Sequence, residues 1–144
     1  MFSAVADTLD KTVAFHAWSD ANPLQTLPQG ALILNHVVTN IGSAYDPVTG
    51  IFTAPLSGLY DFQATIMEYH VKNYAEAGIY IDSHLVAMGL CDNRHGSNYD
   101  QSSMKAVVHV NAGSKVALKN LENSTSDFYG VQFTTFSGYL IKAD

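Results

Sequence analysis

The chain has 144 residues, and its formal net charge is −6 with only 14% charged side chains. This length suits one domain built around a single core. The seven Lys and Arg residues are scattered, which argues against a nucleic-acid partner, and no apolar run approaches the roughly 18 residues needed for membrane insertion as a spanning helix.

Residues 1–11 are predicted to be an N-terminal extension, and residues 12–144 to form the globular domain. The extension lacks the basic start and the full apolar core of a signal peptide. Two explanations stay open at this point. Either a signal peptide has been removed, or the protein is cytosolic.

Turn-forming residues and alternating apolar residues follow one another along the chain, with few helical signals. From Tyr60 to Ile66 every second residue is apolar, which is typical of a strand with one buried face. Asp46–Gly50 predicts a turn, and Pro55 ends a short strand because it has no N–H to donate. The predicted strands cover residues 12–18, 31–38, 51–53, 58–69, 77–88, 103–110, 115–121 and 128–141. This succession predicts an antiparallel β-sandwich.

The stretch from Asn40 to Phe62, NIGSAYDPVTGIFTAPLSGLYDF, carries the clearest motif. Its spacing of Asn, aromatic and Gly residues resembles the signature of the C1q domain, the globular head of the C1q and tumour-necrosis-factor-like superfamily. Leu34 and Ala64 stand where the family pattern has aromatic residues. The segments VAFHA, AGSKVAL and FSGYLI resemble further family strands. SAYDPVTGIFTAP and HGSNYDQSS look most like the short, stalkless C1q-domain proteins of molluscs.

The resemblance implies an all-β fold, an antiparallel jelly-roll sandwich of two sheets. It implies a homotrimer in which apolar and aromatic residues surround a threefold axis. It also implies a secreted, extracellular protein whose signal peptide has been removed.

Catalytic signatures are missing from the sequence. The six His residues form no HExxH or HxH pair, and there is no Gly-x-Ser-x-Gly elbow or Gly-rich phosphate loop. We therefore expect that the protein is not an enzyme.

The segment 91–103, CDNRHGSNYDQSS, predicts a calcium site. Asp92 and Asp100 lie eight residues apart in a loop rich in oxygen-bearing side chains, which are the ligands that calcium prefers. The segment resembles the calcium loop of adiponectin-like C1q trimers. That resemblance implies the Asp92 and Asp100 carboxylates and the Asn93 carbonyl as ligands, with three chains together completing the shell. The alternative is that Asp92-Asn93 and Asn98-Tyr99-Asp100 only form Asx turns.

The same loop offers candidate ligand-binding residues. Arg94 suits an acidic sugar, and His95 and Tyr99 offer ring faces for stacking. A second candidate patch holds Tyr69, His70 and Tyr74, for which we prefer ordinary surface aromatics at a strand end.

Two further residues are candidates for a covalent bond, a disulfide in one case and a glycan in the other. Cys91 is the one cysteine, so it either pairs between chains or, as we prefer, is a buried small side chain. Asn123-Ser124-Thr125 is an N-glycosylation sequon, and Asn123 would carry the glycan in the secretory pathway.

These features predict an innate-immune, lectin-like recognition protein that binds microbial or acidic glycans as a homotrimer, linked to calcium. The first alternative is a cytokine- or adipokine-like ligand for a protein receptor. The second is an extracellular-matrix component, for which the 13 acidic residues are too dispersed.

Overall fold

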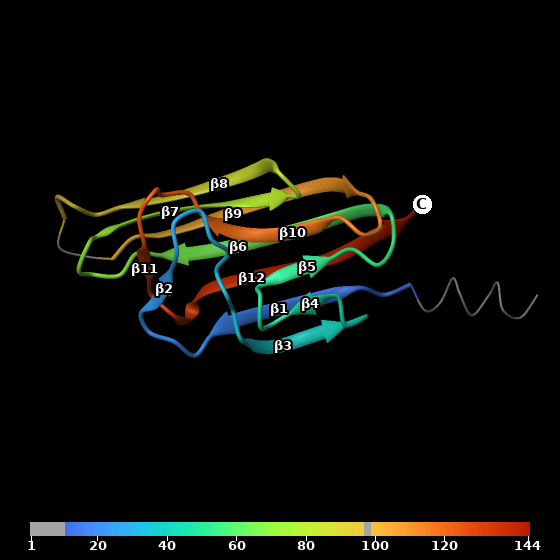
Figure 1. The fold of residues 1–144 in the computed structure, drawn as a ribbon, viewed down its shortest axis with the longest axis horizontal. Coiled ribbons are helices and arrows are strands. Elements are labelled where there is room, and N and C mark those ends of the chain that lie inside the picture. The colour runs from blue at the N-terminus through green and yellow to red at the C-terminus, as the bar shows by residue number, and fades with distance from the viewer. Residues whose placement is uncertain (1–10, 97–98) are drawn as a thin grey trace, which may run out of the picture.

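The computed structural model describes residues 11–96 and 99–144, and these form a flattened β-sandwich (Figure 1). The predicted extension, residues 1–11, lies outside the described residues except for Lys11. The strands are β1 (Ala14–Ser19), β2 (Leu24–Thr26), β3 (His36–Ile41), β4 (Tyr45–Asp46), β5 (Ile51–Thr53), β6 (Gly58–Met67), β7 (Tyr74–Ile81), β8 (His84–Asp92), β9 (Gln101–Val110), β10 (Lys115–Asn120), β11 (Ser126–Phe128) and β12 (Val131–Ala143).

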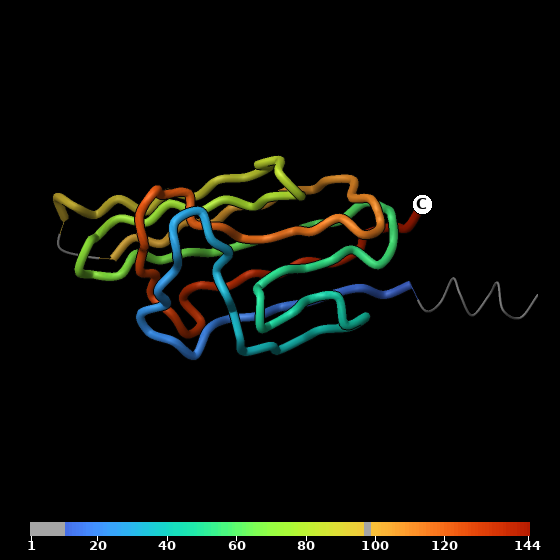
Figure 2. The backbone as a smooth tube through the Cα atoms, in the orientation of Figure 1, coloured from blue at the N-terminus to red at the C-terminus, as the bar shows by residue number. Residues whose placement is uncertain are grey.

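Two five-stranded sheets form the layers of the sandwich (Figure 2). The first sheet has the order β3-β1-β12-β6-β9 and the second has the order β4-β5-β10-β7-β8. β2 and β11 make a small separate pair, and every described strand pairing is antiparallel. The prediction of an all-β, two-sheet jelly-roll sandwich is confirmed, and the part of the chain that the structure describes contains no helix.

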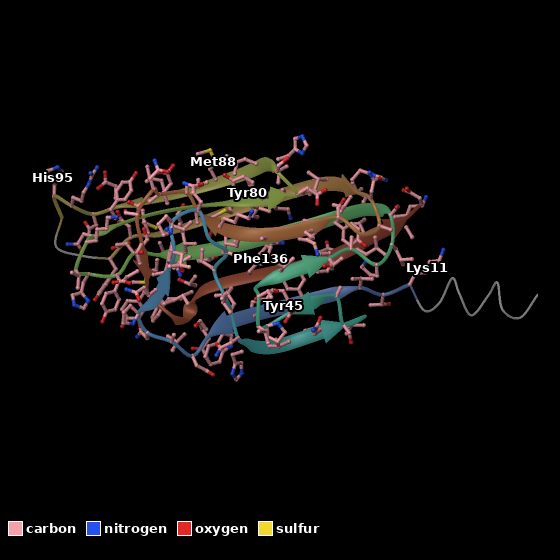
Figure 3. All side chains as sticks on the ribbon, viewed as in Figure 1. Lys11, Tyr45, Tyr80, Met88, His95 and Phe136 are labelled. Atoms are coloured by element: carbon pink, nitrogen blue, oxygen red, sulfur yellow. The ribbon has the colours of Figure 1, made fainter. Side chains whose placement is uncertain are left out.

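The core between the sheets contains a group of packed aromatic rings. Phe15 lies at its centre, with ring centroids 4.9 Å from Tyr45, 5.1 Å from Phe52 and 5.0 Å from Phe136. All four side chains are buried. Phe136 and Tyr45 come from β12 and β4, so the rings hold both sheets together (Figure 3). Burying an aromatic side chain contributes about 1.5–3 kcal/mol.

Residues of the motif from Asn40 to Phe62 fix the conformation of the backbone at its turns. The Asn40 amide donates to the Tyr45 carbonyl at 2.8 Å and accepts from the Tyr45 N–H at 3.1 Å, which closes the β3–β4 connection. Gly50 has φ +76°, and a Cβ there would lie 2.4 Å from the Leu32 carbonyl oxygen. Glycine is therefore required at this turn.

The prediction of one strand over 77–88 is wrong. The chain turns back between β7 and β8, and Asp82 has a positive φ of 52°. Two hydrogen bonds hold this turn to β10, from the Asp82 N–H to the Lys115 carbonyl at 2.7 Å and from the Lys115 N–H to Asp82 Oδ1 at 2.9 Å. The turn has no Gly or Pro, and its Asp82-Ser83 pair is a weak turn signal within a run of alternating apolar residues.

Two other predicted strands are interrupted. Within 31–38, Ala31 makes only an isolated bridge to Lys119, and strand β3 begins at His36. The intervening Leu32 and Leu34 are buried in an extended segment that lacks ladder pairing, so their alternation reflects burial alone. The predicted strand 128–141 is divided at Tyr129–Gly130 into β11 and β12. The remaining predicted strands correspond to strands of the structure, with shifted ends.

No helix that could span a membrane occurs in residues 11–96 and 99–144.

Candidate functional site

The predicted site residues gather at one end of the sandwich, which we call the apical end. It carries the β8–β9 loop, residues 93–100, and it lies opposite the end where β12 finishes (Figures 1 and 3). β8 runs to Asp92 and β9 starts at Gln101, so Asp92 and Asp100 flank this loop. Asn98 lies outside the described residues.

Asp92 is bound by Arg94. The guanidinium donates from Nε to Oδ1 at 2.8 Å and from Nη2 to Oδ2 at 2.7 Å, and the Arg94 backbone N–H lies 3.3 Å from Oδ1. This contact between the Arg94 N–H and Asp92 Oδ1 is the Asx turn that the sequence offers as the alternative to a calcium site. Hydrogen bonding by Arg94 lowers the pKa of Asp92 to about 2.

Arg94 also contacts Tyr74 on the neighbouring strand β7. Its guanidinium carbon lies 4.6 Å from the centroid of the Tyr74 ring, and Tyr74 is opposite Asp92 in the β7–β8 ladder. The Tyr74 hydroxyl donates to Glu76 Oε2 at 3.0 Å. A cation over a tyrosine face is attracted by the ring quadrupole. Arg94 is therefore already engaged within its own chain.

The other end of the loop, at Asp100, is held by the side chain of Glu68. Glu68 is 0% exposed, and its two carboxylate oxygens lie 2.8 and 3.0 Å from the backbone N–H of Asp100. Because a buried carboxylate needs hydrogen-bond donors, this contact fixes the start of β9 to the end of β6. Sequence reasoning missed Glu68, although it continues the inward-facing series from Tyr60 to Ile66 as a single charged residue.

Tyr99 belongs to an aromatic cluster that the structure assembles from distant segments. The cluster consists of Tyr69, His70, Tyr99, Tyr129 and Phe133. Ring centroids are 5.9 Å apart for Tyr69 and Tyr129, 5.3 Å for Tyr99 and Tyr129, and 5.1 Å for Tyr129 and Phe133. The Tyr99 hydroxyl lies 3.3 Å from His70 Nδ1. Tyr99 is 45% exposed and Phe133 is 46% exposed, so the cluster presents ring surface to solvent.

The structure thus groups the residues of the two predicted patches, the loop 93–100 and the patch around His70, differently from the prediction. Tyr69 and His70 join Tyr99 in the aromatic cluster, whereas Tyr74 holds Arg94. His95 is exposed at the tip of the loop (Figure 3). Sequence reasoning named neither Tyr129 nor Phe133 as a site residue.

The donor set of the loop fits calcium in kind. Asp92 and Asp100 offer carboxylates that are exposed, and among the described residues the Asn93 carbonyl accepts the Gly96 N–H, at 3.2 Å. A carbonyl oxygen has two lone pairs, so it can still bind a cation. Within the described residues of one chain, no group of three His, Cys, Asp or Glu side chains has the geometry of a metal site. Any calcium ion would therefore need oxygens beyond these side chains, and Arg94 already holds Asp92.

Asn123 and Cys91 differ in accessibility. Asn123 is exposed, and its Oδ1 accepts a hydrogen bond from Gln29 Nε2 at 3.1 Å. Cys91 is 1% exposed, and its thiol lies 3.5 Å from the Ile66 carbonyl oxygen. Burial raises the pKa of the Cys91 thiol to about 11. The preferred prediction of a buried cysteine is confirmed.

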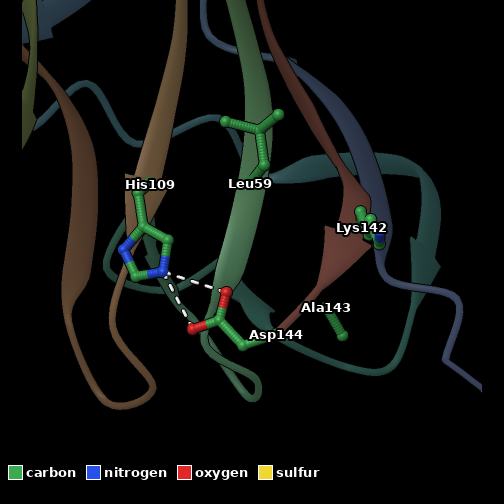
Figure 4. Close-up of a pocket in the computed structure, with 5 residues that line it drawn as sticks. All are labelled: Leu59, His109, Lys142, Ala143 and Asp144. Atoms are coloured by element: carbon green, nitrogen blue, oxygen red, sulfur yellow. Dashed lines mark hydrogen bonds and ion pairs between the residues drawn. The ribbon is translucent and has the colours of Figure 1, made fainter.

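A surface pocket of about 380 Å³ lies at the opposite end, lined by Leu59, His109, Lys142, Ala143 and Asp144 (Figure 4). His109 Nε2 is 2.9 and 3.1 Å from the two Asp144 carboxylate oxygens. The principal polar groups of this pocket thus pair with each other. The sequence predicted no site residue there.

The outer face of the first sheet has a buried charge at its centre. Asp61 lies between Tyr139 and Val107 in the ladder and is only 3% exposed. Its Oδ2 is 2.7 Å from Lys105 Nζ, while Oδ1 is buried and has no hydrogen-bond partner among the residues that the structure describes. The same sheet also carries exposed apolar side chains outside the aromatic cluster, namely Ile41, Leu59, Val107, Tyr139 and Ile141.

Comparison with known proteins gives a family match over nearly the whole chain, because residues 14–141 match the C1q domain. The chain belongs to the C1q domain family. C1q-family domains typically form trimers, and the family consists of recognition and signalling proteins without catalytic activity. The family resemblance read from the motif around Asn40 to Phe62 is thereby confirmed.

Relatives of this C1q domain include human complement C1q tumor necrosis factor-related protein 3, which is 30% identical over 76% of the chain. Mouse complement C1q tumor necrosis factor-related protein 6 is 28% identical over 79% of it. The chain spans 44% of the length of each relative. It is similar in fold to the globular domain of zebrafish complement 1qA (TM-score 0.77, 18% identity, 92% of this chain and 99% of that chain). It is also similar to the Eiger TNF from S. frugiperda (TM-score 0.74, 8% identity, 93% and 95%).

Proposed function

We propose that this C1q domain is a secreted, lectin-like recognition module that binds microbial or acidic glycans. The observation that carries the proposal is the aromatic cluster, whose exposed Tyr99 ring lies beside His70 at the apical end. Sugar-binding sites combine ring faces, which cover the apolar side of a pyranose, with a few fixed polar groups. The His70–Tyr99 contact and the nearby Gln101, whose amide is fixed on the Phe133 carbonyl at 3.0 Å, provide such groups.

The proposed assembly is a homotrimer formed through the outer face of the first sheet. Monomers rarely expose large contiguous apolar surface, and this face combines five exposed apolar or aromatic residues outside the aromatic cluster with the incompletely paired Asp61. A neighbouring protomer would cover the apolar residues and supply a hydrogen-bond donor to Asp61 Oδ1. Three weak sugar sites on one rigid trimer would bind a repetitive surface with avidity.

Calcium is the proposed cofactor, with Asp92, Asp100 and the Asn93 carbonyl as its ligands. The support is the hard-oxygen donor set at the two ends of the 93–100 loop. When bound, calcium would neutralise these carboxylates and fix the loop. Its absence would leave Asp92 paired with Arg94, as described above.

Secretion and N-glycosylation at Asn123 belong to the same proposal. The sequon lies on exposed backbone next to β11, where a glycan has room. The segments SAYDPVTGIFTAP and HGSNYDQSS support a likeness to the short C1q-domain proteins of molluscs. A mass decrease after treatment with a peptide N-glycosidase tests the glycan, with Asn123→Gln as the control.

A cytokine-like ligand for a protein receptor is the second candidate. The observation that favours it is the outer surface of β8, where Met88 is 57% exposed and Leu90 is 54% exposed. These side chains lie on the edge strand of the second sheet, and neither belongs to the aromatic cluster. A receptor that buries them would lose affinity when both are changed to Ser.

A glycan and microbial-polysaccharide array distinguishes these functions, probed in calcium and again in EDTA. Selective binding that EDTA abolishes supports a calcium-linked lectin. Selective binding that survives EDTA supports the lectin and removes calcium as its mediator. No binding in either condition contradicts the lectin proposal and favours the receptor ligand.

A further inference from the structure

A buried carboxylate without a cationic partner lies beside the aromatic cluster. Glu68 is 0% exposed, and both of its oxygens lie on one donor, the Asp100 N–H, at 2.8 and 3.0 Å. Among the residues that the structure describes, no Lys, Arg or His side chain forms an ion pair with Glu68. A buried charge is costly unless an opposite charge lies beside it. The charge of Glu68 is therefore incompletely balanced within its own chain.

Glu68 lies where three members of the aromatic cluster meet. It precedes Tyr69 in the chain, and the N–H that it binds belongs to the residue after Tyr99. The β-bridge partner of Glu68 is the residue before Tyr129. Tyr99 is 45% exposed, so the buried charge lies close beneath ring surface that solvent reaches.

The negative charge acts on the groups around it. Burial raises the pKa of the Cys91 thiol to about 11, and the charges of Glu68 and Asp100 contribute to the rise. Such interactions are strong where little water screens them. The Asp100 carboxylate is exposed next to Tyr99, and the faces of aromatic rings are themselves negative. The aromatic cluster therefore attracts positively charged groups.

Two cations at the apical end are already paired with other carboxylates. Arg94 donates two hydrogen bonds to Asp92, at 2.8 and 2.7 Å. Lys72 Nζ lies 2.7 Å from Glu122 Oε1. An acidic sugar stacked on Tyr99 would lie close to carboxylates and could bind these cations only by displacing their partners. A sugar with a positive charge meets no such cost.

We propose that the aromatic cluster selects sugars that carry a protonated amine, such as hexosamine units without an N-acetyl group. This inference rests on the proposed function and narrows its ligand from microbial or acidic glycans to amine-bearing ones at the same site. The apolar face of the pyranose covers a ring, and the ammonium group offsets the charges of Glu68 and Asp100. An ammonium group over a ring face is attracted by the ring quadrupole as well.

The test is isothermal titration calorimetry of the full chain with three oligosaccharides of equal length, at a pH where amines are protonated. They are a glucosamine hexamer, its fully N-acetylated counterpart and a galacturonate hexamer. We expect the wild type to bind the glucosamine hexamer about fivefold more tightly than the N-acetylated one, because a cation–π contact at an exposed site contributes about this factor. The galacturonate hexamer should bind most weakly.

Four variants locate the preference. Glu68→Gln removes the buried charge and keeps an oxygen for the Asp100 N–H, so it should lose the preference for the amine and still bind the N-acetylated hexamer. Asp100→Asn, at the surface, should lose part of the preference. Glu122→Gln is the matched control, because it removes the same charge at the same end from a pair with Lys72. Tyr99→Ala should lose binding of both hexamers.

Four results would overturn the inference. Equal affinity of the wild type for both hexamers, with both lost in Tyr99→Ala, contradicts it and leaves the proposed function in place. Tighter binding of the galacturonate hexamer supports an acidic ligand instead. Equal loss of the preference in Glu68→Gln and Glu122→Gln attributes it to net charge. Glucosamine binding that Tyr99→Ala retains places the cationic sugar elsewhere on the chain.

Discussion

Both carboxylate oxygens of Glu68 lie within hydrogen-bond distance of one backbone N–H, that of Asp100, at 2.8 and 3.0 Å. The contact joins the end of β6 to the start of β9 beneath the apical loop. It places Tyr99 beside Tyr129 and His70, which come from other segments. The geometry of the aromatic cluster thus depends on a buried charge.

Replacing Glu68 should loosen this junction. In Glu68→Ala, we expect hydrogen exchange at the Asp100 amide to speed up by about tenfold or more, because a hydrogen bond to a charged acceptor is worth about 1.5–3 kcal/mol. Exchange measured by NMR or mass spectrometry checks this. Glu122→Gln, in a neighbouring loop, is the control. Unchanged protection of Asp100 in Glu68→Ala would contradict the anchoring role.

Lys105 should stabilise the folded domain mainly because it pairs with the buried Asp61. In Lys105→Met the Asp61 carboxylate loses its ion pair with Lys105, and an unsatisfied buried group costs about 1–3 kcal/mol. The double variant Asp61→Leu with Lys105→Met should recover most of that loss, since apolar replacement of both partners is close to neutral. Urea unfolding measures both, with the exposed Lys115→Met as control. If the double variant is less stable than Lys105→Met, the explanation is wrong.

The fold was readable from the sequence because its signals are local. Asn40 and Tyr60 act within five residues, through hydrogen bonds to the carbonyls of Tyr45 and Leu56 that lie inside the motif. The β7–β8 turn was not readable, because Asp82 takes a positive φ through hydrogen bonds to Lys115, more than thirty residues away.

The candidate site was readable only in part. The loop 93–100 and Tyr99 were found from composition, but pairing of Arg94 with Asp92 and Tyr74 depends on how β7 and β8 face each other. Tyr129 and Phe133 reach the cluster from the far end of the chain. No short-range pattern indicates such a meeting.

Tyr45 should make the domain sensitive to alkali. Its hydroxyl donates to the Leu34 carbonyl at 2.9 Å, and burial raises its pKa from 10.0 to about 12. An acid with a raised folded-state pKa contributes stability that is complete below the unfolded pKa and is lost as the pH rises through the folded one. The loss should therefore run from about pH 10 to pH 12. In Tyr45→Phe the free energy of unfolding should be about 1 kcal/mol lower at pH 7.

The same variant should show a flatter pH dependence above pH 10. Urea unfolding of both proteins at pH 7, 9 and 10.5 measures the difference, and Tyr80→Phe serves as a partly exposed control. Parallel curves for wild type and Tyr45→Phe would contradict this assignment.

Cys91 should be unreactive in the folded protein. Its thiol is buried, and its pKa of about 11 leaves little thiolate at pH 8. We expect labelling by a maleimide or a disulfide reagent at pH 8 to be at least about a hundredfold slower than in urea, because it requires local opening. Rapid stoichiometric labelling without denaturant, or a disulfide-linked dimer on a non-reducing gel, would show an accessible thiol.

The most direct test of the central claim is the affinity of a polysaccharide selected on the array for Tyr99→Ala, measured beside the wild type and Tyr80→Ala. Tyr80 lies on β7 outside the aromatic cluster, under Lys119. Loss of one stacking ring should weaken binding by about tenfold in Tyr99→Ala, in line with an aromatic contact worth about 0.5–1.5 kcal/mol beyond its buried area. Tyr80→Ala should bind as the wild type does. Equal binding by Tyr99→Ala and the wild type would contradict recognition through the aromatic cluster.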